Sequence, residues 1–167
     1  MKRLLVLLCA PVLVLIATAQ PAQAVSPHFI RADANLSGTN LVVSFKEAGL
    51  GTNQLITYMA SADSNVTYVC VNRGGANPSA SNKTSESGPV SATGTFSSGK
   101  NGQVTASLTV EPPAVPTDFS CPPGQQLKTA QVTYTHVMVT DTTNDVSESI
   151  PWTFDTGCLL PNVRGAC

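Results

Sequence analysis

The chain has 167 residues, with 9 Lys and Arg against 10 Asp and Glu, and a formal net charge of −1 at pH 7. No basic stripe occurs in it, which argues against a nucleic-acid partner. No apolar run after residue 24 reaches the roughly 20 residues that a membrane-spanning helix needs. We therefore expect no integral membrane segment in the mature protein.

The first residues have the layout of a secretory signal peptide. Lys2 and Arg3 supply a positive start, residues 4–18 are apolar apart from Pro11, and Ala22-Gln23-Ala24 is an A-x-A cleavage site. We predict that residues 1–24 are removed and that residues 25–167 are secreted to the extracellular space. Removal of two basic residues leaves seven basic against ten acidic residues, a net charge of −3.

Short runs of alternating apolar and polar residues, rich in Val, Thr and Tyr, predict β-strands along the rest of the chain. The predicted strands span 29–36, 41–47, 54–60, 66–72, 89–96, 103–110, 127–140 and 146–156. Pro151 marks an edge or a bulge in the last of them. Asn101-Gly102 is a hairpin turn signal between 89–96 and 103–110. Residues 73–87 form a long polar loop, and loops of this length are often functional or mobile.

Seven or eight short strands predict an all-β fold. The most economical architecture is a two-sheet antiparallel β-sandwich of immunoglobulin-like type, and a small β-barrel is the alternative. We expect one domain over residues 25–157, followed by a C-terminal tail, 158–167, closed by a disulfide bond.

Four cysteines remain after cleavage: Cys70, Cys121, Cys158 and Cys167. An even number in an exported chain favours two disulfide bonds, and four cysteines allow three connectivities. Cys158 and Cys167 are only nine residues apart, so their closure costs little chain entropy. This pairing leaves Cys70 with Cys121 as the long-range bond. The close C-x₂₋₄-C pairs of a zinc site do not occur.

Four segments carry a resemblance to known proteins: Val43 to Gly51, Thr67 to Gly75, Ser97 to Gly102 and Phe119 to Gln125. Through them the chain resembles a group of small secreted proteins of actinomycetes and filamentous fungi that have no established activity. The resemblance covers most of the mature domain but not the Cys158–Cys167 tail. It implies a compact exported domain, and it assigns no catalytic or binding residue.

No pattern of residues predicts a catalytic, cofactor-binding or metal site. His136 lies in the middle of a strand, and we expect it to be packed or on the sheet surface. Acidic residues that could pair as in a glycosidase are scattered, and we expect them to be solvated: Glu47, Glu111, Glu148 and Asp155. Asp141 to Asp145 offers oxygen ligands that suit calcium, but a hairpin turn explains these residues better.

These observations favour a non-catalytic binding or interaction module at or outside the cell surface, with a glycan, a cell-wall component or a protein as its ligand. Exposure of Tyr58, Tyr68 or Trp152 on one face would favour a glycan. Two alternatives stay open. One is a secreted hydrolase of unrecognised type that uses His136, and the other is a structural, envelope-associated protein.

Overall fold

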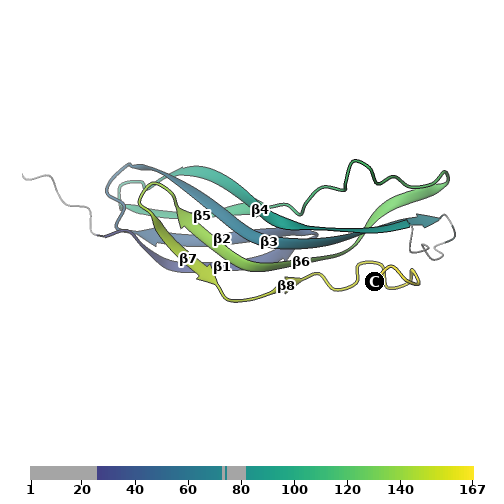
Figure 1. Ribbon diagram of the computed structural model, residues 1–167. Coiled ribbons are helices and arrows are strands. Elements are labelled where there is room, and N and C mark those ends of the chain that lie inside the picture. The colour runs from purple at the N-terminus through teal and green to yellow at the C-terminus, as the bar shows by residue number, and fades with distance from the viewer. Residues whose placement is uncertain (1–25, 73, 75–81) are drawn as a thin grey trace, which may run out of the picture.

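The computed structural model describes residues 26–72, 74 and 82–167. The predicted signal peptide, residues 1–24, lies outside the described residues. Eight strands form two antiparallel sheets that pack face to face (Figure 1). The predicted all-β, two-sheet sandwich is therefore confirmed, and the β-barrel alternative is not.

One sheet has three strands and the other has five. The strand order in the three-stranded sheet is β1 (His28–Ser37), β2 (Asn40–Ala48) and β5 (Gln103–Val110). The order in the five-stranded sheet is β4 (Lys83–Ser97), β3 (Leu55–Asn72), β6 (Gln125–Asp141) and β7 (Val146–Ile150), with β8 (Phe154–Asp155) also paired to β6. The predicted strand 146–156 is thus divided into β7 and β8, and Pro151 lies in the interruption.

The core lies between the sheets and follows from the alternation of each strand. Every second residue of β2 and of β3 points inward, so Leu41, Val43 and Phe45 meet Tyr58 and Ala60. The rings of Phe45 and Tyr58 lie 4.5 Å apart between their centroids. Burial of side chains of this size stabilises the fold by about 1.5–3 kcal/mol each.

The prediction of two short strands at 54–60 and 66–72 was wrong, because β3 runs without a break from Leu55 to Asn72. The polar residues between them pair with both neighbouring strands: Asp63, for example, lies opposite Pro89 of β4 and opposite Thr135 of β6. The side chains of Asp63 and Asn65 point away from the core, and the buried polar residue between them is the small Ser64, so polarity there does not interrupt the strand. The predicted loop 73–87 is also shorter than expected, since residues 83–87 belong to β4. Residues 73 and 75–81 lie outside the described residues.

The predicted hairpin at Asn101-Gly102 was wrong as well. β5 pairs with β2, whereas β4 pairs with β3, so this turn carries the chain from one sheet to the other. The Ser98 hydroxyl donates to the carbonyl oxygen of Gly51 at 2.6 Å and accepts from the amide of Gln54 at 2.9 Å. These bonds join the turn to the connection between β2 and β3. The turn is therefore held by this connection and not by pairing of β4 with β5.

At one end β3, β4 and β6 continue past the three-stranded sheet and form an extension that we call the arm (Figure 1). Cys70–Cys121, one of the two predicted disulfide bonds, fastens the β5–β6 connection to the arm. The Tyr68 hydroxyl donates to the carbonyl oxygen of Pro113 at 2.6 Å and adds a second attachment.

The second predicted disulfide bond, Cys158–Cys167, closes the C-terminal tail. Ala166 of this tail packs with Val69 and Ala130 in a small separate hydrophobic cluster. The tail therefore covers part of the arm. Two disulfide bonds are typical of proteins in an oxidising compartment.

Candidate functional site

The outer face of the five-stranded sheet is interrupted by a β-bulge at His136. In the pairing of β3 with β6, Ser61 lies opposite Met138 and Asp63 lies opposite Thr135, so β6 holds one extra residue. His136 has a φ of 51°, in the left-handed region that non-glycine residues seldom adopt. Bulges of this kind often redirect a side chain next to a functional site.

The bulge changes which residues share a face of β6. The simple alternation predicts Val132, Tyr134 and His136 on one face and Val137 on the other. In the structure Val132, Tyr134 and Val137 are all in the core, whereas His136 is on the outer surface. The extra residue shifts the alternation by one position, and this corrects the predicted faces.

The bulge places the imidazole of His136 beside the carboxylate of Asp63. Nδ1 of His136 lies 2.9 Å from Oδ2 of Asp63. The two side chains are 82% and 58% exposed, so the pair is open to solvent. An exposed pair of this kind adds little stability. The unusual backbone of His136 is therefore not explained by folding alone, and such strain is concentrated at functional sites.

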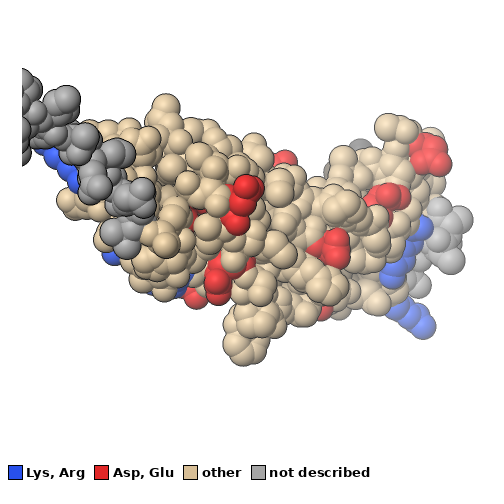
Figure 2. Space-filling view, turned by 60° about the vertical axis from the view of Figure 1, so that its left-hand side comes forward, with Lys and Arg blue, Asp and Glu red and all other residues tan. Residues whose placement is uncertain are grey.

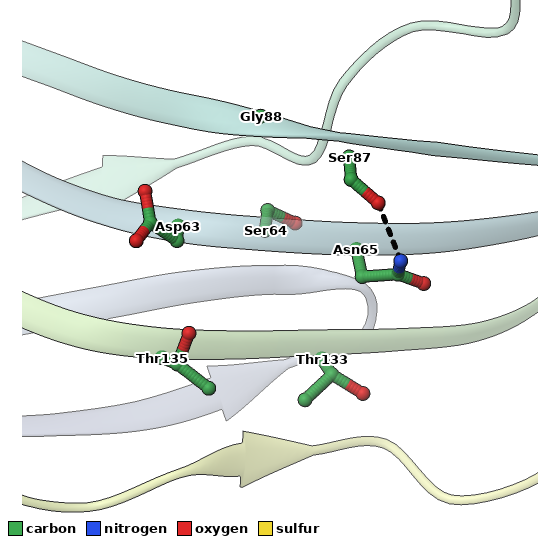
Figure 3. Close-up of a pocket in the computed structure, with 7 residues that line it drawn as sticks. All are labelled: Asp63, Ser64, Asn65, Ser87, Gly88, Thr133 and Thr135. Carbon is green, nitrogen blue, oxygen red and sulfur yellow. Dashed lines mark hydrogen bonds between the residues drawn. The ribbon is translucent and has the colours of Figure 1, made fainter.

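Two hollows lie on either side of this pair. The first has a volume of about 320 Å³, and nearly all of the residues that line it have polar side chains (Figure 3). It crosses β4, β3 and β6 and is lined by Asp63, Ser64, Asn65, Ser87, Gly88, Thr133 and Thr135. Asn65 donates to the Ser87 hydroxyl within it.

The second hollow has a volume of about 450 Å³ and is lined by larger apolar side chains together with polar ones. Its wall includes His136, Met138, Pro151 and Trp152, and Thr135 lines both hollows. Trp152 is 69% exposed. The two hollows share Thr135 as a lining residue, and together they extend across the strands from β4 to the segment after β7. We call the two hollows together the transverse groove.

The sheet surface around the groove is rich in hydroxyl groups. Thr57 faces Thr95 at 3.0 Å between hydroxyl oxygens, and Thr140 faces Ser147 at 3.0 Å. These pairs join neighbouring strands side by side. The surface therefore offers many hydrogen-bond donors and acceptors, and exposed Asp155 is paired with Thr133 beside the first hollow.

Of the three aromatic residues that would indicate a glycan surface, only Trp152 is exposed. Tyr58 and Tyr68 are buried. Burial raises the pKa of Tyr68, and it also raises the pKa of Tyr134, to about 12. The Tyr134 hydroxyl donates to the carbonyl oxygen of Thr39 at 2.8 Å.

Glu47 is a further departure from the sequence-based expectation. We expected a solvated carboxylate, but Glu47 is fully buried in the core beside Tyr58 and Asp141. Neither of its carboxyl oxygens has a hydrogen-bond partner among the described residues. The signal was present in the sequence, since Glu47 continues the inward-facing alternation of Val43 and Phe45.

This environment changes the acidity of Glu47. Burial raises its pKa from the ordinary 4.5 to about 7, because a charged carboxylate is poorly solvated in the core. The Tyr58 hydroxyl is near enough to lower the pKa somewhat, although it does not reach hydrogen-bond geometry with Glu47. The Asp141 carboxylate raises the pKa further.

The turn that contains Asp141 accounts for the residues that suggested calcium. Oδ1 of Asp141 accepts from the amides of Thr143 at 2.8 Å and Asn144 at 3.0 Å, and Oδ2 accepts from the Asn144 side chain. The carboxylate therefore closes the β6–β7 turn. Within the described ranges no three His, Cys, Asp or Glu residues come together as metal ligands.

His136 meets only part of the requirement for hydrolase chemistry. A Ser-His-Asp arrangement needs a hydroxyl that hydrogen-bonds to the imidazole nitrogen that the carboxylate leaves free. Asp63 supplies the carboxylate, but no serine or threonine of the described part of the chain donates such a bond to His136. The groove has two of the three groups.

Comparison of the chain with protein-family models, with curated proteins and with solved structures found no match. Among the residues that the structure describes, no helix is long and apolar enough to cross a membrane.

Proposed function

We propose that this protein is a secreted, non-catalytic module that binds a glycan in the transverse groove. The observation that carries the proposal is the exposed indole of Trp152 beside the His136–Asp63 pair. A sugar has an apolar face of C–H groups and a rim of hydroxyl groups. It therefore suits a site with one aromatic surface and a few directed polar groups.

The two hollows offer these two kinds of contact next to each other. Trp152, Pro151 and Met138 present apolar surface in the second hollow. Asp63 and Asn65 present acceptors and donors in the first. The groove crosses four strands, a span of about 14 Å at ordinary strand spacing. A short stretch of a sugar chain fits that length better than a single small molecule.

The charge of the groove indicates a neutral ligand at this position. Among the described residues that line it, Asp63 is the only one with a carboxylate, and this carboxylate is already paired with His136. No Lys or Arg lines either hollow. Export of the chain, inferred from residues 1–24, would bring such a surface into contact with extracellular polysaccharides.

The experiment is affinity measurement of residues 25–167, with both disulfide bonds formed, on a panel of neutral polysaccharides. Trp152→Ala should weaken binding to the retained polysaccharide at least about tenfold, as expected for an anchor residue of a binding site. Leu55→Ala is the matched control, because Leu55 is 71% exposed and lies outside the groove. Retention of no polysaccharide by the wild-type protein would refute the proposal.

The His136–Asp63 pair keeps a hydrolase as the alternative function. The two functions differ in their products, because a hydrolase releases new reducing ends from the bound polysaccharide. We expect no release by the wild-type protein during prolonged incubation. Release that His136→Ala abolishes would favour the hydrolase instead.

A further inference from the structure

A second surface of the molecule gathers positive charge. Lys83 on β4 and Lys128 on β6 are both paired with Val69 of β3, one from each side. Directly paired residues point to the same face of a sheet. The two lysines therefore lie on the same face as Val69, about 10 Å apart at ordinary strand spacing.

The C-terminal tail brings a third cation to the same place. Val163 and Ala166 pack against Val69 and Ala130, and exposed Arg164 lies between them in the chain. Figure 2 shows blue side chains at the end of the molecule where the arm lies, with a red group above them. We call Lys83, Lys128 and Arg164 the arm cations.

The arm cations lack an acidic partner in the part of the chain that the structure describes. None of them forms an ion pair among the described residues, where the recorded pairs are Arg31–Asp33 and His136–Asp63. The acidic residue of β4, Glu86, is paired with Val66 in the core and so belongs to the opposite face of the sheet.

We propose that the arm cations bind an extended polysaccharide that carries carboxylate or sulfate groups. Charge complementarity carries the proposal, because three unpaired cations around one small cluster attract a chain with repeated anionic groups. The separation of the two lysines, about 10 Å at ordinary strand spacing, suits separate charges along a polymer better than one compact anion.

The position of the patch supports a polymer rather than a small ion. The arm cations and the transverse groove lie on the same face of the five-stranded sheet. Asp63 and Val69 are six residues apart on β3, which is about 20 Å along a strand. One extended chain can therefore contact both surfaces, or the patch can bind alone. The proposal goes beyond the neutral groove and uses different residues.

The test measures binding of residues 25–167 to polygalacturonate and to dextran sulfate at two salt concentrations. The patch variant is Lys83→Gln, Lys128→Gln and Arg164→Gln combined. The control variant is Arg31→Gln, Lys46→Gln and Lys100→Gln combined. It also removes two lysines and one arginine, but from other surfaces. Both variants thus have the same net charge, and thermal unfolding establishes that each is folded.

We expect wild-type binding to at least one of the two polymers, weakened by added salt because bound counterions are released on association. The patch variant should lose at least about tenfold in affinity at low salt, and the control variant much less. Trp152→Ala should keep this salt-sensitive binding, so failure of the patch and failure of the groove are distinguishable.

Four results would overturn the proposal. Equal loss in the two variants would show an effect of net charge alone. Absence of binding, or binding without salt dependence, would remove the electrostatic basis. Binding to phosphatidylglycerol vesicles with no binding to either polymer would assign the patch to a membrane surface. Tighter binding to single-stranded DNA than to either polymer would assign it to nucleic acid.

Discussion

Replacement of Glu47 by Gln tests the buried carboxyl group directly. Gln has nearly the same shape but cannot ionise, so the core keeps its volume while the titration is removed. In the wild-type protein the pKa of Glu47 is raised from 4.5 to about 7, chiefly by burial. The folded state therefore binds this proton more tightly than the unfolded state.

The sign and size of the effect follow from linkage between protonation and folding. The stability associated with protonated Glu47 is fully present below pH 4.5 and is lost as the pH rises through about 7. A difference of 2.5 between these two pKa values corresponds to about 3 kcal/mol at about 1.36 kcal/mol per unit. Above pH 8 the Gln variant should be more stable than the wild type by up to that amount.

The assay is urea unfolding of both proteins between pH 4 and pH 8.5, with the free energy of unfolding obtained by linear extrapolation. The two proteins should be close in stability near pH 4 and should diverge up to about pH 8. Parallel curves over this range would refute the reasoning, since they would mean that Glu47 ionises in the folded protein as it does in the unfolded chain.

Three further substitutions have defined outcomes. Cys158→Ser with Cys167→Ser should cost about 2.6 kcal/mol in urea unfolding, from a loop of 9 residues; an unchanged midpoint would contradict this. His136→Gly should stabilise the protein by about 1 kcal/mol, because glycine adopts a φ of 51° without strain. His136→Ala should not stabilise it, and equal effects of the two changes would count against strain. Tyr134→Phe should cost about 1–3 kcal/mol, since the carbonyl oxygen of Thr39 loses its donor. A cost near zero in the same unfolding assay would contradict that assignment.

The sequence predicted the parts of the fold that depend on local alternation. The first hairpin, with Leu41, Val43 and Phe45 in the core, is an example. The alternation of apolar and polar residues over a few positions is enough to identify the buried face of each strand. Both disulfide pairings followed from sequence separation. Strand pairing was harder: Asn101-Gly102 is a hairpin signal, but the partner of β5 is decided by packing between the two sheets.

The transverse groove could not be predicted for a related reason. A β-bulge depends on the register between two strands, and nothing in the sequence near His136 marks the extra residue. Asp63 is 73 residues away in the chain and meets His136 only through the pairing of β3 with β6. The burial of Glu47, in contrast, was available from the alternation of β2, and it was missed because charged residues are usually solvated.

The most direct test of the proposed function compares wild type, Trp152→Ala and Leu55→Ala on the neutral polysaccharide that the wild-type protein retains best. We predict at least about a tenfold loss for Trp152→Ala and affinity near wild type for Leu55→Ala. Equal affinity of all three proteins would contradict a glycan site in the transverse groove.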